Sequence, residues 1–279
     1  MTGAVWLLSG FGDEIDPAPE VQVAVLRALD APRIEVRSAW NVNVAEWSEV
    51  ELDRYRQILS KAEVTASVIA SPIGKVDVGV PTEEEVARLG RMIEVARRLD
   101  SRLIRIFSFF CGARGGPAAN RSAVLTKMAA LARAAERAGV VLIHENEKEI
   151  YGDTPERVLD LIESVGSPAL RVAWDSANFV QVGVEPYARA YPLLAEHIAH
   201  LHIKDAVMGT GEVVLPGEGD GALAQIIAAQ REAGYRGYVS LEPHLAEVGT
   251  FGGSSGPQRF GQAARALRAL TERMGVQLG

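Results

Sequence analysis

The stretch VVLIHENEKEIYGDTPERVLDLIESVGSPALRVAWDSANF, residues 140–179, contains one complete strand–helix–strand unit. Residues 140–144 and 170–174 are short apolar runs, and residues 155–165 between them carry apolar side chains three and four positions apart, as one face of a helix does. Strands that are apolar throughout are buried on both faces, which is typical of a parallel sheet. Because two parallel strands need a crossover of this length, the stretch predicts a parallel βαβ unit.

The same unit recurs along the whole chain. The other runs predicted as strands are 5–11, 33–37, 64–70, 103–107, 198–203 and 238–241. The helical pattern covers residues 17–30, 49–61, 82–99, 121–138, 155–165, 186–196, 221–233 and 257–274. Eight right-handed βα units in a row close naturally into a barrel. The predicted fold class is α/β, a (β/α)8 TIM barrel, in a single domain over residues 1–279, because no linker divides the chain. A doubly wound open sheet is the alternative.

The composition is that of a soluble globular protein. Of the 279 residues, 48% are hydrophobic and 23% are charged, which is enough apolar surface for a large core. The net charge of -7 lacks the basic field that attracts a phosphate backbone, so no nucleic-acid partner is expected. No apolar run reaches the ~20 residues that cross a bilayer, so no membrane partner is expected. A single cysteine, Cys111, and a start without an export signal lead us to expect a cytoplasmic protein. Assembly into a homo-oligomer is left open.

Polar side chains that can bind metal follow the last four predicted strands. In such barrels the active site lies at the carboxyl ends of the strands. These ends read HENE from residue 144, WDSAN from 174, HLHIKD from 200 and LEPH from 241, and each supplies a carboxylate or an imidazole. In HLHIKD the alternation of a strand puts His200 and His202 on the same face, and only His202 is near enough to the end to reach the barrel mouth. The candidate ligands are therefore Glu145, Asp175, His202 and Glu242.

Three carboxylates in one barrel mouth predict a divalent cation, because unpaired they would repel one another strongly. Oxygen-rich ligands with a single imidazole suit Mn²⁺ best, with Mg²⁺, Co²⁺ or Zn²⁺ as the other candidates. The alternative is a salt-bridge network in which the carboxylates pair with Lys204, Arg105 and Arg171. We expect one metal ion, because four successive strand ends agree.

A second group of polar residues at the strand ends is predicted to contact a substrate. It comprises Arg37, Lys75, Glu147, Asn178, Lys204 and His244. Two glycine-rich loops, residues 111–116 and 249–256, follow the fourth and eighth strands and either cover the substrate or serve as ordinary connections. The stretch PGEGDG at 216–221 has only a loose likeness to a phosphate-binding loop and is interpreted as a turn before a helix.

Eight short motifs carry a resemblance to a known family. In chain order they are GFGDEI, IEVRS, SPIGK, HENEKEIYGDTPE, WDSANF, HIKDA, GEGDG and SLEPH. With them, nearly the whole chain resembles the xylose isomerase-like superfamily of barrel enzymes, the sugar phosphate isomerase/epimerase group that includes ketohexose 3-epimerases, hydroxypyruvate isomerases and inosose dehydratases. The resemblance implies that Glu145, Asp175, His202 and Glu242 hold the metal, in agreement with the assignment made from the residues alone.

Two positions depart from the pattern of the ketohexose 3-epimerases. Those enzymes carry a histidine three residues after the metal-binding aspartate, where this chain has Asn178. They also carry an arginine shortly after the metal-binding histidine, where Met208 stands and Lys204 is the nearest cation. Both departures concern the substrate rather than the metal.

Together these features predict a metal-dependent sugar isomerase or epimerase. Glu145 and Glu242 follow strands that are three apart, so they approach a central substrate from directions roughly 135° apart. One glutamate would remove a proton next to a carbonyl and the other would return it, while the metal holds the enediolate. The expected substrate is a keto- or aldo-sugar or a related polyol. The alternatives are a lyase or dehydratase acting on a sugar or inosose, an endonuclease IV-like enzyme that cleaves phosphodiesters, and a non-catalytic sugar-binding barrel.

Overall fold

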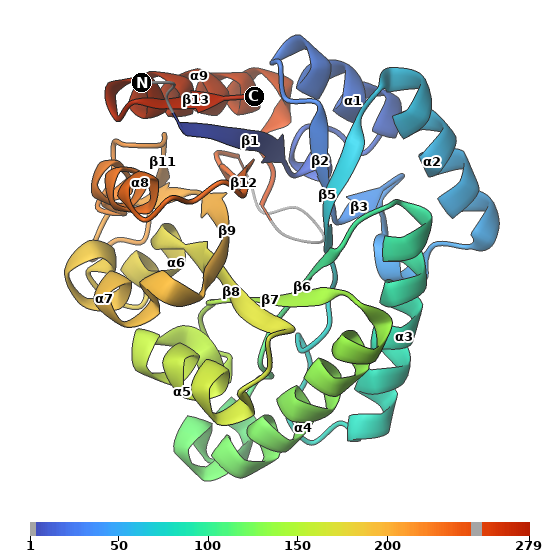
Figure 1. The fold of residues 1–279 in the computed structure, drawn as a ribbon, viewed down its shortest axis with the longest axis vertical. Helices are drawn as coiled ribbons and strands as arrows, with labels where there is room; N and C mark the ends of the chain where they lie inside the picture. Colours follow the sequence, from blue (N-terminus) through green and yellow to red (C-terminus); the bar gives the residue numbers. More distant parts are fainter. Residues whose placement is uncertain (1–3, 247–252) are drawn as a thin grey trace.

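The structure, a computed structural model, describes residues 4–246 and 253–279. Eight parallel strands form the wall of a barrel, and helices surround it (Figure 1). The strands are β1 (Ala4–Gly10), β2 (Arg33–Val36), β5 (Thr65–Ala70), β6 (Leu103–Ile106), β7 (Val141–Glu145), β8 (Leu170–Asp175), β9 (Ile198–Ile203) and β12 (Tyr238–Leu241). Each coincides with one of the eight predicted runs to within one residue at either end. The predicted TIM barrel is therefore confirmed.

Every neighbouring pair in the wall is parallel. The strands follow the order β1-β12-β9-β8-β7-β6-β5-β2 around the barrel. Between β2 and β1 the wall closes through a parallel bridge that joins Glu35 to Phe11, the residue just past the end of β1. A further strand, β13 (Val276–Leu278), pairs with the beginning of β1. Because the wall is closed and parallel, the carboxyl ends of all eight strands open on one side.

The helices lie outside the wall. They are α1 (Pro19–Ala28), α2 (Glu49–Ala62), α3 (Thr82–Arg98), α4 (Gly116–Ala138), α5 (Pro155–Val165), the π-helical turn η5 (Pro186–Ala190) that continues into α7 (Tyr191–Leu194), α8 (Leu223–Glu232) and α9 (Gly256–Arg273). In α5 the residues at the predicted spacing, Val158, Leu161 and Ile162, are buried. All eight predicted helical segments are present. Helix α4 begins five residues earlier than predicted, since a proline in its first turn favours a helix start there.

Several short elements after the strands escaped the sequence analysis. They are α6 (Ser176–Gln181) and the hairpins β3 (Ser38–Ala39) with β4 (Val42–Asn43) and β10 (Asp205–Ala206) with β11 (Val213–Val214). None is long enough for a hydrophobic period to show in the sequence. They follow β2, β8 and β9, so they elaborate the side of the barrel on which the strands end.

The structure describes the first of the two predicted glycine-rich loops in full and the second only in part. The first contains the 3-10 turn η3 (Gly112–Arg114) and leads directly into α4. Of the second, predicted at 249–256, residues 249–252 lie outside the described part of the chain, and Gly256 begins α9. Among the helices of the described residues, none combines the length and the apolar character needed to span a bilayer.

Polar side chains occupy part of the barrel interior. Ser9 of β1 and Ser67 of β5 join their hydroxyl groups at 2.7 Å, and Glu35 of β2 reaches His200 of β9 at 2.9 Å. All four residues are buried. Neither pair comes from adjacent strands, so these side chains point inward and meet inside the barrel. Interiors of this fold are usually filled with branched apolar residues, so a polar layer here calls for a specific cause.

Candidate metal centre

Four side chains from four neighbouring strands meet at the mouth of the barrel. Glu145 ends β7, Asp175 ends β8, His202 lies in β9, and Glu242 directly follows β12. None of the four is more than 3% exposed. Each offers one possible ligand atom, and these atoms all lie within 4.8 Å of one another. The structure thus brings together the four residues that the sequence analysis proposed as ligands.

The cluster contains buried polar atoms without hydrogen-bond partners. Among the residues that the structure describes, His202 Nδ1 and Glu242 Oε2 have no hydrogen-bond partner, and Asp175 Oδ2 has only an ion pair with Lys204. Buried polar atoms are nearly always paired, so orphaned atoms that face one another are a feature with a chemical cause. Three carboxylates with one imidazole are the donor set that a hard divalent cation binds. The residues present therefore fit a metal ion of this kind.

Local contacts direct the free oxygen of Asp175 into the cluster. Asp175 caps helix α6, because its Oδ1 accepts the backbone N–H of Asn178 at 2.8 Å. Asn146 accepts the backbone N–H of Asp175 at 3.0 Å and donates to its carbonyl oxygen at 2.9 Å. With the backbone and one oxygen of Asp175 held in this way, Oδ2 remains available to the cluster.

Each glutamate of the cluster is held by a buried arginine. Arg105 of β6 donates from Nη1 to Oε2 of Glu145 over 2.7 Å, and Arg37, which follows β2, donates from Nη1 to Oε1 of Glu242 over 3.0 Å. The other oxygen of each glutamate lies near Nδ1 of His202, at 3.4 Å for Glu145 Oε1 and 3.5 Å for Glu242 Oε2. The two glutamates therefore share one arrangement, with one oxygen on a guanidinium and one facing the centre of the cluster.

Part of the salt-bridge alternative is also present. Besides the two arginines, Lys204 places its Nζ 2.8 Å from Asp175 Oδ2 and 3.8 Å from Glu242 Oε2. The predicted pairing of Arg171 is wrong, because this residue lies at the opposite end of β8 from Asp175 and donates to the backbone oxygen of Glu196. Since the carboxylates have cationic neighbours, charge repulsion alone does not require a metal. The orphaned atoms are the stronger argument for one.

The charges around the cluster keep both glutamates ionised. Burial and the charge of Glu242 would raise the pKa of Glu145, but His202 and Arg105 outweigh them and hold it below its ordinary value. Burial would also raise the pKa of Glu242, yet its neighbours, Lys204 foremost, hold it well below. At neutral pH both side chains are therefore carboxylates that can accept a proton or bind a cation.

His144 precedes Glu145 on β7 and so points to the opposite face of the strand. Its Nε2 contacts Ser108 Oγ at 2.9 Å, and burial lowers the pKa of His144 to about 4. As the pH falls below 7, the unfolded chain takes up a proton at about 6.5, before the folded chain does, so the folded state loses stability.

The difference between 6.5 and about 4 corresponds to about 3 kcal/mol. We therefore expect wild type to lose about 3 kcal/mol more unfolding free energy between pH 7 and pH 4 than a His144→Gln variant does. Urea unfolding at a series of pH values measures this difference. Equal losses in the two proteins would show that His144 is not buried as a neutral ring.

The predicted substrate contacts do not all lie in the same surroundings. Asn178 donates from Nδ2 to Glu145 Oε1 at 3.3 Å, so together with Arg37 and Lys204 it touches the candidate ligand carboxylates directly. Lys75 and Glu147 instead pair with each other at 2.8 Å and are 35% and 25% exposed. A substrate role for all of these residues stays a prediction.

His244, the remaining predicted substrate contact, connects the ends of β12 and β1. Its Nε2 lies 3.2 Å from Glu14 Oε1 and 3.3 Å from Glu242 Oε1, and it accepts the backbone N–H of Gly253 at 3.1 Å. The other oxygen of Glu14 accepts the hydroxyl of Ser255 at 2.7 Å. Burial raises the pKa of Glu14. His244 is thus in contact with the candidate ligand Glu242 and, at 23% exposed, also with solvent.

The glycine-rich turn at 216–221 is filled by a side chain of the protein. Asp205 accepts the backbone N–H groups of Gly217 at 2.8 Å, Gly219 at 3.1 Å and Gly221 at 2.8 Å. A Cβ added at Gly219 or Gly221 would stand 2.6 Å from Asp205 Oδ1, so the close approach needs glycine at both positions. These amides are therefore engaged by a carboxylate, which agrees with the interpretation of the stretch as a turn.

The sequence analysis missed two charged residues of the barrel interior. Glu35 received no role, and Arg105 was considered only as a salt-bridge partner. Burial would raise the pKa of Glu35, but His202 and His200 outweigh it and hold it far below its ordinary range. A signal was present in the sequence, since Glu35 in RIEV and Arg105 in LIRI each stand between two apolar residues inside a strand. A charge in a strand buried on both faces needs a partner across the barrel.

Comparisons with known proteins bear on the family. A family model described as the xylose isomerase-like TIM barrel matches residues 23–271. The 2-epi-5-epi-valiolone 7-phosphate 2-epimerase of Actinoplanes sp. is 31% identical over 166 residues, which are 56% of this chain and 56% of that protein. The D-psicose 3-epimerase of Enterocloster bolteae is 27% identical over 136 residues, 48% of this chain and 43% of that protein. The chain thus spans about half the length of the curated relatives it matches.

Solved structures share the fold over nearly the whole chain. The IOLI protein, solved with a bound zinc atom, superposes with a TM-score of 0.78 at 15% identity, and the match covers 96% of this chain and 98% of that one. A likeness at this identity speaks for the fold alone. The family model, by contrast, matches the sequence itself from within α1 into the last turn of α9. The chain belongs to the xylose isomerase-like TIM barrel family.

Proposed function

We propose that the chain is a metal-dependent sugar isomerase or epimerase that acts on a keto- or aldo-sugar or a related polyol. The observation that carries the proposal is the cluster of Glu145, Asp175, His202 and Glu242, whose ligand atoms lie within 4.8 Å of one another at the barrel mouth. Both curated relatives are named as epimerases, which supports this reaction class.

The four side chains would hold one divalent ion, and Mn²⁺ suits their oxygen-rich donor set best. When bound, such an ion would draw electrons from a substrate carbonyl and make the neighbouring C–H more acidic. The identity of the ion is part of the proposal.

Glu145 and Glu242 would act as the acid and base. Their strands, β7 and β12, are three apart around the wall, so the two carboxylates would face a central substrate from directions roughly 135° apart. One, as a carboxylate, would accept the proton from the carbon beside the carbonyl. The other, after taking up a proton from solvent when the substrate binds, would deliver it to a different face or to the neighbouring carbon, and the first would then return its proton to solvent. Arg105 and Arg37 would hold the two carboxylates in orientation, each by one oxygen.

Other residues of the mouth would bind substrate hydroxyl groups. Lys75 and Glu147 offer a donor and an acceptor at the partly exposed rim. Lys204 and Asn178 contact the cluster itself and would meet oxygens close to the reacting carbon. Positioning of this kind is how a barrel of common design selects one sugar among many.

Deuterium uptake from solvent tests the proposal. The protein is stripped with EDTA, reloaded with Mn²⁺ and incubated in D₂O with a panel of ketoses, aldoses, inososes and their phosphates. We expect at least one sugar to gain one deuterium at a carbon beside its carbonyl, as read by NMR, and the stripped protein to give none. No uptake by any sugar with the metal-loaded protein would contradict the proposal. A product that has lost water would assign the chain to the dehydratases instead.

A further inference from the structure

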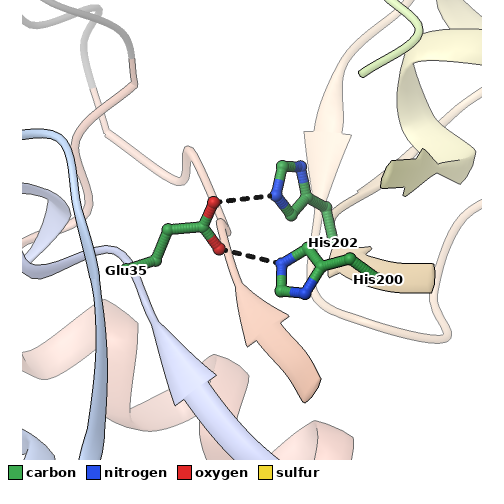
Figure 2. A group of neighbouring side chains, drawn as sticks. All are labelled: Glu35, His200 and His202. Carbon is green, nitrogen blue, oxygen red and sulfur yellow. Dashed lines mark hydrogen bonds and ion pairs between the residues drawn. The ribbon is translucent and has the colours of Figure 1, made fainter. Parts of the chain in front are cut away.

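Glu35 lies inside the barrel, on a strand three places around the wall from the strand that carries His202. It belongs to β2 and is completely buried, as are His200 and His202 of β9. Figure 2 shows its carboxylate facing the two imidazole rings, with one oxygen turned to each. A residue that only filled this space would be apolar, because an ionised group buried inside a protein is unfavourable unless it is paired.

Both oxygens of Glu35 are engaged by the same type of ring atom. Oε2 lies 2.9 Å from Nε2 of His200, and Oε1 lies 3.2 Å from Nε2 of His202. A carboxylate can only accept hydrogen bonds, so each Nε2 must carry a hydrogen. In a neutral ring the lone pair is then on Nδ1.

The Nδ1 atom of His202 is the one that faces the candidate ligands. It lies 3.4 Å from Glu145 Oε1 and 3.5 Å from Glu242 Oε2, and no residue in the described part of the chain forms a hydrogen bond with it. The bond from Nε2 to Glu35 therefore both selects the tautomer and sets the direction of the ring. His200 takes the second oxygen of Glu35 and so restrains the carboxylate from rotating.

We propose that Glu35 is a positioning residue for metal binding, which holds His202 with its hydrogen on Nε2 and its lone pair on Nδ1, directed at the ligand cluster. The inference rests on the metal site of the proposed function. It also explains why β2 carries a carboxylate in the barrel interior. Substituting a carboxylate that holds a ligand histidine in this way typically weakens metal binding 10–100-fold, and about this effect is expected for Glu35.

A different interpretation is that Glu35, His200 and His202 themselves form a second metal site, since one ligand atom from each lies within 4.8 Å of the others. The distances oppose this interpretation, because both Nε2 atoms already reach the carboxylate directly and leave no lone pair toward it. Metal stoichiometry separates the two interpretations, since a second site would bind two ions for each chain.

Calorimetric titration of the EDTA-stripped protein with Mn²⁺ tests the proposal without any substrate. We expect one ion for each wild-type chain and a Kd raised about 10–100-fold by Glu35→Gln, because an amide is a weaker acceptor or turns its NH₂ toward a ring. Glu85→Gln is the matched control: Glu85 is equally buried but accepts from Gly74 and Arg88 outside the cluster. It should leave the Kd within about twofold of wild type, since it touches no ligand.

Nitrogen-15 NMR of the wild-type imidazoles, with Zn²⁺ bound, provides a second measurement that does not depend on whether a variant folds. We expect Nε2 of His202 to be protonated and Nδ1 to be the metal-bound nitrogen. The reverse assignment, two ions for each chain, or an unchanged Kd in Glu35→Gln would overturn the role of Glu35 and leave the metal site standing. Absence of metal binding by wild type would overturn both.

Discussion

A Glu145→Gln or Glu242→Gln variant, loaded with metal, is expected to exchange substrate hydrogen with solvent about 10²–10⁴-fold more slowly than wild type. Glutamine has nearly the shape of glutamate but cannot accept the proton from carbon. Both side chains are buried ionised groups with one oxygen facing the cluster, so each substitution removes a base from its place without opening a cavity. Deuterium uptake from D₂O measures the rate.

These variants also lose a candidate ligand oxygen, so the rates must be compared at saturating metal, with bound metal measured on each sample. Glu232→Gln provides the control for the same chemical change on the surface, because its side chain is 74% exposed on α8, and its rate should equal that of wild type. Wild-type exchange in both of the active-site variants would refute the assignment of the two glutamates as acid and base, although the metal site could still stand.

The free energy of unfolding of an Arg105→Met variant is expected to be about 3–5 kcal/mol lower than that of wild type at pH 7. Arg105 and Glu145 are 5% and 3% exposed, and their ion pair spans 2.7 Å. Without the guanidinium, the carboxylate of Glu145 stays buried beside the like charge of Glu242. The variant also loses the stacking of Arg105 on the ring of Phe107, whose centroid lies 4.4 Å away. Denaturant unfolding in EDTA measures the loss, since bound metal would replace part of the missing charge.

Two further measurements separate the charge effect from lost packing. The double variant Arg105→Met/Glu145→Gln removes the unpaired charge together with its partner and should be more stable than Arg105→Met alone. Without Arg105, burial and Glu242 should raise the pKa of Glu145 in the folded chain. The deficit of Arg105→Met should then shrink as the pH falls toward that pKa, because protonation removes the unpaired charge. Lost packing alone would be indicated if the unfolding free energy lost in Arg105→Met did not change with pH and the double variant lost the sum of the two single losses.

Local patterns in the sequence were sufficient for the barrel. Eight short apolar runs separated by helical periods predicted all the wall strands to within one residue, because a strand buried on both faces must be apolar wherever it lies. The same logic separated His202 from His200, since alternation along β9 places both inward and only the later one near the mouth. Short elements such as α6 were missed because six residues show no period.

The sequence by itself determined the eight βα units and the four polar residues at the last strand ends, because both follow from the order of neighbouring residues and from the rule that parallel strands end on one side. Only the tertiary structure decided how the charges pair. Arg37 reaches Glu242 across 205 positions of the chain and Glu35 reaches His202 across 167, and no local pattern specifies such contacts. They exist because the closed wall turns side chains from strands that are not neighbours toward one another, in a space too small and too dry to leave a charge alone.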